Sequence, residues 1–110
     1  MALHHITSKE EFDKLVAGGK PVLVDFYAEW CGPCQVMGPM IEEMAENFEH
    51  ADKVEIAKLD VDKVPDVSET YGVMSIPTFI IFDGGKPAET LVGSQPIDAI
   101  KSKLSAHIKN

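Results

Sequence analysis

The two cysteines of the chain, Cys31 and Cys34, are separated by two residues at the point where an apolar run gives way to helical spacing. Residues 22–24 read as a buried strand, so the pair lies where a strand passes into a helix. A helix N-terminus carries unpaired N–H groups and roughly half a positive charge. Both favour the thiolate, the reactive form of cysteine. We expect Cys31 at the rim and Cys34 one turn inside, partly shielded, as a reversible disulfide.

A metal site is the main alternative for two closely spaced cysteines. Zinc takes about four ligands, and the histidines do not show a spacing that completes such a set; they are His4, His5, His50 and His107. An inert buried pair is the remaining alternative. Redox chemistry is the interpretation we favour, and we expect no metal.

Two charged residues interrupt apolar strands. Asp25 lies inside the run that precedes the cysteines, where burial disfavours the carboxylate and raises its pKa. A carboxylate that titrates near neutrality can accept the proton of Cys34, although the residues alone also allow an edge or exposed acid. Lys58 interrupts a later strand, and its stem can equally well lie along apolar surface with the ammonium in solvent.

Composition limits the possible classes of protein. The chain has 110 residues, of which 45% are apolar and 25% charged, as in a soluble domain with a single core. The net charge is −8 and the basic residues are ten lysines, which disfavours nucleic acid and anionic membranes as partners. We expect no signal peptide and no membrane span. Two cysteines spaced CxxC are not a secreted disulfide framework, so we expect a cytoplasmic protein.

The hydrophobic periodicity predicts nine elements in the order β-α-β-α-β-α-β-β-α. The first helix begins at a Thr7 or Ser8 cap and the second continues through Pro39; the third begins at Pro65. The fourth has a Ser94 or Gln95 cap, with Pro96 in its first turn and a stripe that extends to Ile108. Alternating units followed by a hairpin predict a mixed sheet with helices on both faces, in one domain of residues 1–110. The expected strands are 3–6, 22–28, 54–61, 77–82 and 89–92.

The chain resembles the thioredoxin family over nearly its whole length. The resemblance rests on Val-Asp-Phe-Tyr-Ala-Glu-Trp-Cys-Gly-Pro-Cys at 24–34, Pro39, Ala-Lys-Leu-Asp-Val-Asp at 57–62, Tyr-Gly-Val at 71–73, Ile-Pro-Thr at 76–78 and Val-Gly at 92–93. A lone CxxC motif is weak evidence for the family. The sequence WCGPC after a strand, followed later by Ile-Pro-Thr, is highly specific for it. The resemblance implies an α/β thioredoxin fold, with a central five-stranded mixed sheet flanked by four helices.

The resemblance also implies an activity, the reduction of client-protein disulfides. Cys31 would be the nucleophile and Cys34 the resolving thiol, with Asp25 as the proton-transfer group. Lys58 would lie near Asp25 and oppose the effect of burial on its pKa. Gly32, Pro33 and a cis Pro77 would tune the redox pair, and the client surface would comprise Trp30, Gly32, Pro33, Ile76, Pro77 and Gly93.

No bound cofactor is implied. Electrons would come from NADPH through a thioredoxin reductase, and the family's clients include ribonucleotide reductase, peroxiredoxin and methionine sulfoxide reductase. A monomer is the expected state. The alternatives are a disulfide oxidase or isomerase, against which Pro33 counts because related oxidases and isomerases carry histidine there, and a thioredoxin-fold binding subunit whose dithiol is incidental.

Two positions depart from the family pattern. Gln35 follows the second cysteine where lysine or arginine is usual, and Tyr27 stands where tryptophan is common. Loss of a positive charge beside the dithiol should slightly weaken thiolate stabilisation and can alter docking to the reductase.

Overall fold

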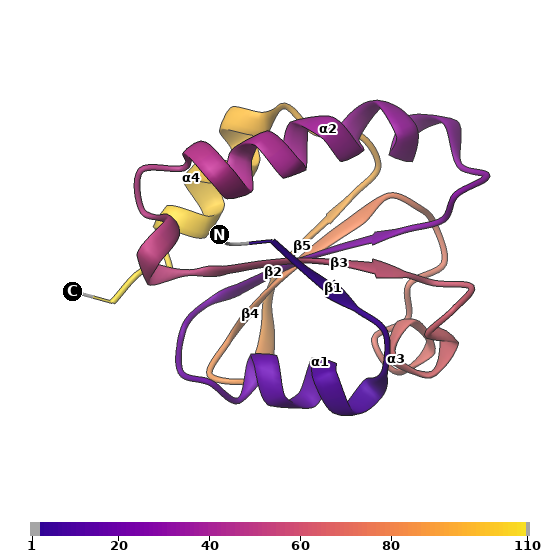
Figure 1. Ribbon diagram of the computed structural model, residues 1–110, viewed down its shortest axis with the longest axis horizontal. Helices are drawn as coiled ribbons and strands as arrows, with labels where there is room; N and C mark the ends of the chain where they lie inside the picture. Colours follow the sequence, from indigo (N-terminus) through magenta and orange to yellow (C-terminus); the bar gives the residue numbers. More distant parts are fainter. Residues whose placement is uncertain (1–2, 110) are drawn as a thin grey trace.

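The computed structural model describes residues 3–109 as a five-stranded sheet with helices on both faces (Figure 1). The order of elements along the chain is the predicted one, with an additional short 3₁₀ turn, η1, before the third strand. The bounds are β1 Leu3–Ile6, α1 Lys9–Val16, β2 Val22–Tyr27, α2 Gly32–Asn47, η1 Ala51–Lys53, β3 Glu55–Asp60, α3 Pro65–Thr70, β4 Thr78–Asp83, β5 Lys86–Val92 and α4 Ile97–Ser105.

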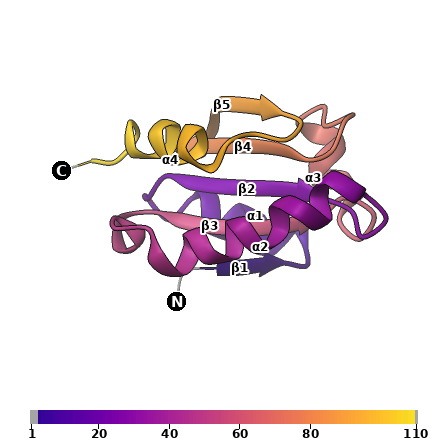
Figure 2. The ribbon, with the colours of Figure 1, turned by 90° about the horizontal axis from the view of Figure 1, so that it is seen from above.

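The strand order in the sheet is β1-β3-β2-β4-β5, seen from above in Figure 2. β1, β3 and β2 run parallel, while β4 is antiparallel to β2 and to β5. Helices α2 and α4 cover one face of this mixed sheet, and α1 and α3 cover the other (Figure 1). The connections of the parallel strands are helical, as parallel pairing requires.

Side chains on β2 and β3 alternate between two buried clusters because successive residues of a strand point to opposite faces. Val24 and Leu59 pack with α1 and α3, whereas Leu23 and Ile56 pack with α2 and α4. By this alternation Asp25 and Lys58 share the face of Leu23 and Ile56. The charged pair therefore lies on the side of the sheet that α2 covers.

The structure confirms the predicted fold class and corrects several boundaries. Strand β5 begins at Lys86 rather than at 89, since its pairing with β4 continues beyond an irregularity at Ile81/Phe82. Helix α4 has Pro96 as its N-cap rather than Ser94 or Gln95, and since proline has no side-chain acceptor, no side chain caps the helix. The amide of Gln95 donates to the Val92 carbonyl at 3.0 Å. Ile108 lies beyond the helix but packs against the core.

Other predicted features are confirmed. The Ser8 hydroxyl caps α1 by accepting the Glu11 N–H at 3.1 Å. Helix α2 continues through Pro39, which lies inside it. None of the helices within residues 3–109 has the length and apolar character needed to cross a membrane.

Candidate active site

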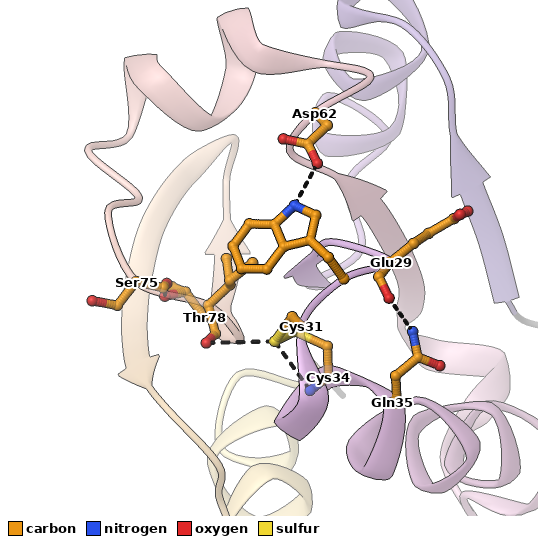
Figure 3. Close-up of a disulfide and its surroundings, with 9 residues drawn as sticks. Glu29, Cys31, Cys34, Gln35, Asp62, Ser75 and Thr78 are labelled. Carbon is orange, nitrogen blue, oxygen red and sulfur yellow. Dashed lines mark hydrogen bonds between the residues drawn. A yellow bond between two sulfur atoms is a disulfide. The ribbon is translucent and has the colours of Figure 1, made fainter.

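The cysteine pair forms a disulfide at the N-terminus of α2, close to the carboxyl end of β2 (Figure 3). Cys31 is the N-cap of the helix, and its sulfur accepts the backbone N–H of Cys34 at 3.2 Å. Pro33 occupies the first turn, where a missing N–H costs no helical hydrogen bond. When the disulfide opens, the Cys31 sulfur is thus held where N–H groups and the helix dipole favour a thiolate.

The predicted difference in exposure between the two cysteines is wrong for this disulfide form. Cys31 is 4% exposed and Cys34 is 6% exposed, so both are buried. Cys31 is covered because Ile76 packs against the pair, and the Ile76 carbonyl oxygen lies 3.8 Å from the Cys31 sulfur. Chain segments 45 residues apart therefore meet at the disulfide.

Asp25 is a buried carboxyl group on the face of the sheet beneath α2. It is 2% exposed, and its Oδ1 has no hydrogen-bond partner among residues 3–109. Removal from water raises its pKa to about 7, and the positive charge of Lys58 only partly opposes that rise. The sequence prediction of a buried acid with a raised pKa is confirmed, so this carboxylate can take up a proton near neutral pH.

Lys58 lies directly beside Asp25 in the register of β2 and β3. Its side chain is 11% exposed, and Nζ lies 3.5 Å from Glu42 Oε2 and 4.6 Å from the centre of the Tyr27 ring. The structure supports the interpretation that Lys58 neighbours Asp25, whereas its largely buried ammonium lies against Glu42 and Tyr27 at a pocket rather than free in solvent. That pocket is lined by Tyr27, Glu29, Cys34, Gln35, Gly38, Pro39, Glu42 and Lys58.

The residues of the expected client surface come from three separate segments. Trp30 is 72% exposed, and Gly32 and Pro33 are exposed beside it. The Ile76–Pro77 peptide bond is cis, as expected. Pro77 is itself buried, and its carbonyl accepts the N–H of Gly93 at 2.8 Å.

Apolar side chains that sequence reasoning did not assign extend these segments. Met74 is 95% exposed just before Ile76, and Val92 is 59% exposed just before Gly93. The signal available in the sequence was their position next to the two short family motifs. Large apolar groups exposed to this degree beside a reactive disulfide are suited to contact another protein chain.

Two polar contacts that hold the loop before Cys31 were also missed (Figure 3). The Trp30 indole N–H donates to Asp62 Oδ2 at 2.8 Å, and the Gln35 amide donates to the Glu29 carbonyl at 2.6 Å. Asp62 follows β3 as Trp30 follows β2, and the ends of adjacent parallel strands meet. Gln35 thus replaces the family's usual positive charge with a neutral donor that contacts the loop.

A metal centre finds no support in the part of the chain that the structure describes. Residues 3–109 contain no group of three or more histidine, cysteine, aspartate or glutamate side chains able to hold an ion.

A disulfide at a helix N-terminus and a buried carboxyl group on the face of the mixed sheet that this helix covers are typical of the dithiol–disulfide oxidoreductases. Comparison with known proteins leads to the same class. The sequence model named Thioredoxin matches residues 3–106, so the chain belongs to the thioredoxin family. As its relatives do, it acts as a protein-disulfide reductase.

Individual relatives cover most of the chain. A thioredoxin of Alicyclobacillus acidocaldarius is 51% identical over 94 residues, which are 86% of this chain and 88% of the relative. A bifunctional thioredoxin reductase/thioredoxin of Mycobacterium leprae is 41% identical over 105 residues, which are 96% of this chain and 22% of that protein. The crystal structure of Malassezia sympodialis thioredoxin has a TM-score of 0.88 at 33% identity and covers 97% of this chain and 94% of its own.

Proposed function

We propose that this protein is a general dithiol reductant in which Cys31 is the nucleophile, Cys34 the resolving thiol and Asp25 the proton acceptor. The observation that carries the proposal is a disulfide at the start of α2 together with a buried carboxyl group, of pKa about 7, on the face of the sheet that α2 covers. The Trp-Cys-Gly-Pro-Cys sequence at 30–34 supports a reducing role, because Pro33 replaces the histidine of related oxidases.

The reaction transfers two electrons from the dithiol to the client. The Cys31 thiolate attacks one sulfur of the client disulfide, which breaks that bond, forms a mixed disulfide and releases a client thiolate that takes up a proton. Cys34 then loses its proton to the Asp25 carboxylate and attacks the Cys31 sulfur. The Cys31–Cys34 bond forms, the mixed disulfide breaks, and the second client sulfur leaves as a thiolate.

The remaining site residues position these reactants. Lys58 holds a positive charge near Asp25 and keeps its pKa from rising further. Gly32, Pro33 and the cis bond before Pro77 set the backbone around the sulfurs. The surface available to an extended client segment is largely apolar and consists of Trp30, Gly32, Pro33, Ile76 and Gly93.

Electrons to restore the dithiol would come from NADPH through a thioredoxin reductase. The fusion of a reductase and a thioredoxin in the Mycobacterium leprae relative supports such a partner. By family resemblance the clients are ribonucleotide reductase, peroxiredoxin and methionine sulfoxide reductase. We place the protein in the cytoplasm as a monomer, since a reducing compartment keeps a CxxC pair in its dithiol form.

The test is NADPH-coupled reduction of insulin disulfides with the cognate thioredoxin reductase. We expect turnover that disappears in Cys31→Ser, while Cys34→Ser accumulates a mixed disulfide with the client, visible by mass spectrometry. Turnover that survives Cys31→Ser would overturn the assignment and favour a binding subunit. A strongly oxidising reduction potential would instead favour a disulfide oxidase or isomerase.

A further inference from the structure

The ammonium group of Lys58 lies in a defined seat formed by α2 and the end of β2. The seat consists of Gly38, Glu42 and Tyr27. Glu42 Oε2 is 3.5 Å from Nζ, and the Tyr27 ring centre is 4.6 Å from it. A carboxylate and an aromatic face are the two groups that most favour an ammonium in a largely buried position.

Gly38 supplies the room for this arrangement. It is a buried residue in the interior of α2, one turn before Glu42 and on the same side of the helix. A Cβ atom built on Gly38 would lie 3.3 Å from Lys58 Nζ, closer than ordinary van der Waals contact. Glycine weakens a helix interior, so its presence here is explained by the ammonium that it admits.

The seat competes with Asp25 for the same positive charge. Asp25 and Lys58 are paired in register on neighbouring strands and share a face of the sheet. Even so, Asp25 Oδ1 has no hydrogen-bond partner within residues 3–109, whereas Nζ is engaged by Glu42 and Tyr27. The ammonium thus acts on Asp25 through space, without a hydrogen bond to that oxygen.

We propose that Glu42 is a positioning residue for the proton-transfer step, because with Gly38 and Tyr27 it holds the Lys58 ammonium at a set distance from Asp25. This inference rests on the proposed role of Asp25. The device is separate from the disulfide, and it assigns a purpose to a surface glutamate and to a glycine inside a helix. It also uses Tyr27, one of the two departures from the family pattern.

The charges around the seat predict the sign of its effect. Asp25 interacts electrostatically with Lys58. The negative charges that act on Tyr27 are those of Asp60, Glu29, Asp25 and Glu42. Neutralising Glu42 removes a negative charge and frees Lys58 to approach Asp25. Both changes favour the Asp25 carboxylate, so both lower the pKa of Asp25 below about 7.

The experiment is a carboxyl-carbon NMR titration of Asp25 in the disulfide form of the full chain. We expect Glu42→Gln to lower the Asp25 midpoint by about half a pH unit or more, a usual size for the effect of a nearby charge. Gly38→Ala should change it by less, because it displaces Nζ by only a few tenths of an ångström without altering the net charge. Glu43→Gln is the matched control, since Glu43 lies in a different pocket with Met40 and Lys101.

A Lys58→Met background separates positioning from a direct charge effect by a double-mutant cycle. If Glu42 acts through Lys58, Glu42→Gln should shift the Asp25 midpoint by clearly less in that background, where only the direct effect of the Glu42 charge remains. An equal shift in both backgrounds, or an equal shift from Glu43→Gln, would overturn the proposal.

Failure of the seat can be told apart from failure of the proposed function. The titration reports on Asp25 whether or not Asp25 moves a proton during turnover. The role of Asp25 itself is tested by the pH profile of the resolving step. If the seat is correct and Asp25 acts in that step, the profile of Glu42→Gln should move to lower pH together with the midpoint.

Discussion

Two clusters of ionisable groups carry their charges in different environments, one within the central strand β2 and one where β4 and β5 meet the C-terminal segment. Asp25 is buried beneath α2 with an oxygen that has no hydrogen-bond partner among the described residues. At the second cluster, the His107 ring lies between two carboxylates, with Nδ1 2.9 Å from Asp83 and Nε2 3.2 Å from Glu89. The first cluster is buried and incompletely paired, and the second is partly exposed and well paired.

The two environments shift pKa values in opposite senses. Burial raises the pKa of Asp25 to about 7. Hydrogen bonds from Lys109 and His107 lower the pKa of Asp83, and a hydrogen bond from His107 lowers that of Glu89. The hydrogen bond to Asp83 in turn raises the pKa of His107.

Linkage turns these shifts into opposite contributions to stability. Asp25 binds its proton more tightly in the folded than in the unfolded chain, so its burial opposes folding once the pH exceeds the unfolded value. His107, Asp83 and Glu89, which pair with one another, favour folding in their charged forms. The Asp25 carboxylate thus lowers stability at the proposed reactive site, whereas the paired charges around His107 raise stability where the C-terminal segment meets β4 and β5.

The largest effect should come from removing the buried carboxyl group. The folded pKa of Asp25 is about 7 against the ordinary value of 3.8, so wild type should lose stability as the pH rises from about 4 to 7. Above pH 7 the cost is on the order of 4 kcal/mol. Asp25→Ala should therefore raise the free energy of unfolding at pH 8 and have little effect at pH 4, as measured by urea titration.

The exposed Asp52 provides a matched control, because Asp52→Ala removes the same group from the surface. If Asp25→Ala raises the free energy of unfolding equally at pH 4 and pH 8, then packing, rather than ionisation, is responsible for the increase.

The second effect concerns rate at the same residue. Without the Asp25 carboxylate, Cys34 must lose its proton to water, so Asp25→Ala should slow the resolving step by on the order of 100-fold near pH 7.5. The measurement is stopped-flow Trp30 fluorescence during release of a mixed disulfide. Identical rates for wild type and variant from pH 6 to 8 would remove Asp25 from the mechanism.

A smaller effect is expected at the second cluster. The pKa of His107 is raised by folding, so its contribution is complete below the unfolded value near 6.5 and disappears as the pH rises through the higher folded value. His107→Gln should lower the midpoint temperature by about 3 °C at pH 6 and by less at pH 9. His5→Gln, on the exposed face of β1, is the control.

If the difference in midpoint temperature between His107→Gln and wild type is the same at pH 6 and pH 9, the ring contributes to stability by packing alone. In that case the contrast between the two clusters would rest on Asp25 only.

The smallest effect should follow removal of Lys109, whose Nζ lies 2.8 Å from Asp83 but whose side chain is 66% exposed. Solvent screens such pairs, so Lys109→Gln should change the midpoint temperature by less than about 1 °C. A larger change in a thermal melt would show that the cluster is more strongly coupled than its exposure suggests.

Local patterns in the sequence were enough to predict the elements and the chemistry of the cysteine pair. The spacing of apolar residues predicted each strand and helix, and the CxxC spacing after an apolar run predicted sulfur at a helix start, as observed for Cys31. An acid within an apolar strand predicted a buried carboxyl group, which Asp25 is. These features depend on neighbours within one or two turns of chain, so the sequence itself contains their cause.

Features that join distant segments were decided only by the tertiary structure. The seat of Lys58 depends on the register of β2 with β3 and on where α2 crosses them. The Trp30–Asp62 bond and the packing of Ile76 over Cys31 also depend on neighbours brought together by folding. Their positions follow from the simultaneous packing of all side chains, which determines burial and register together and which no short stretch of sequence encodes.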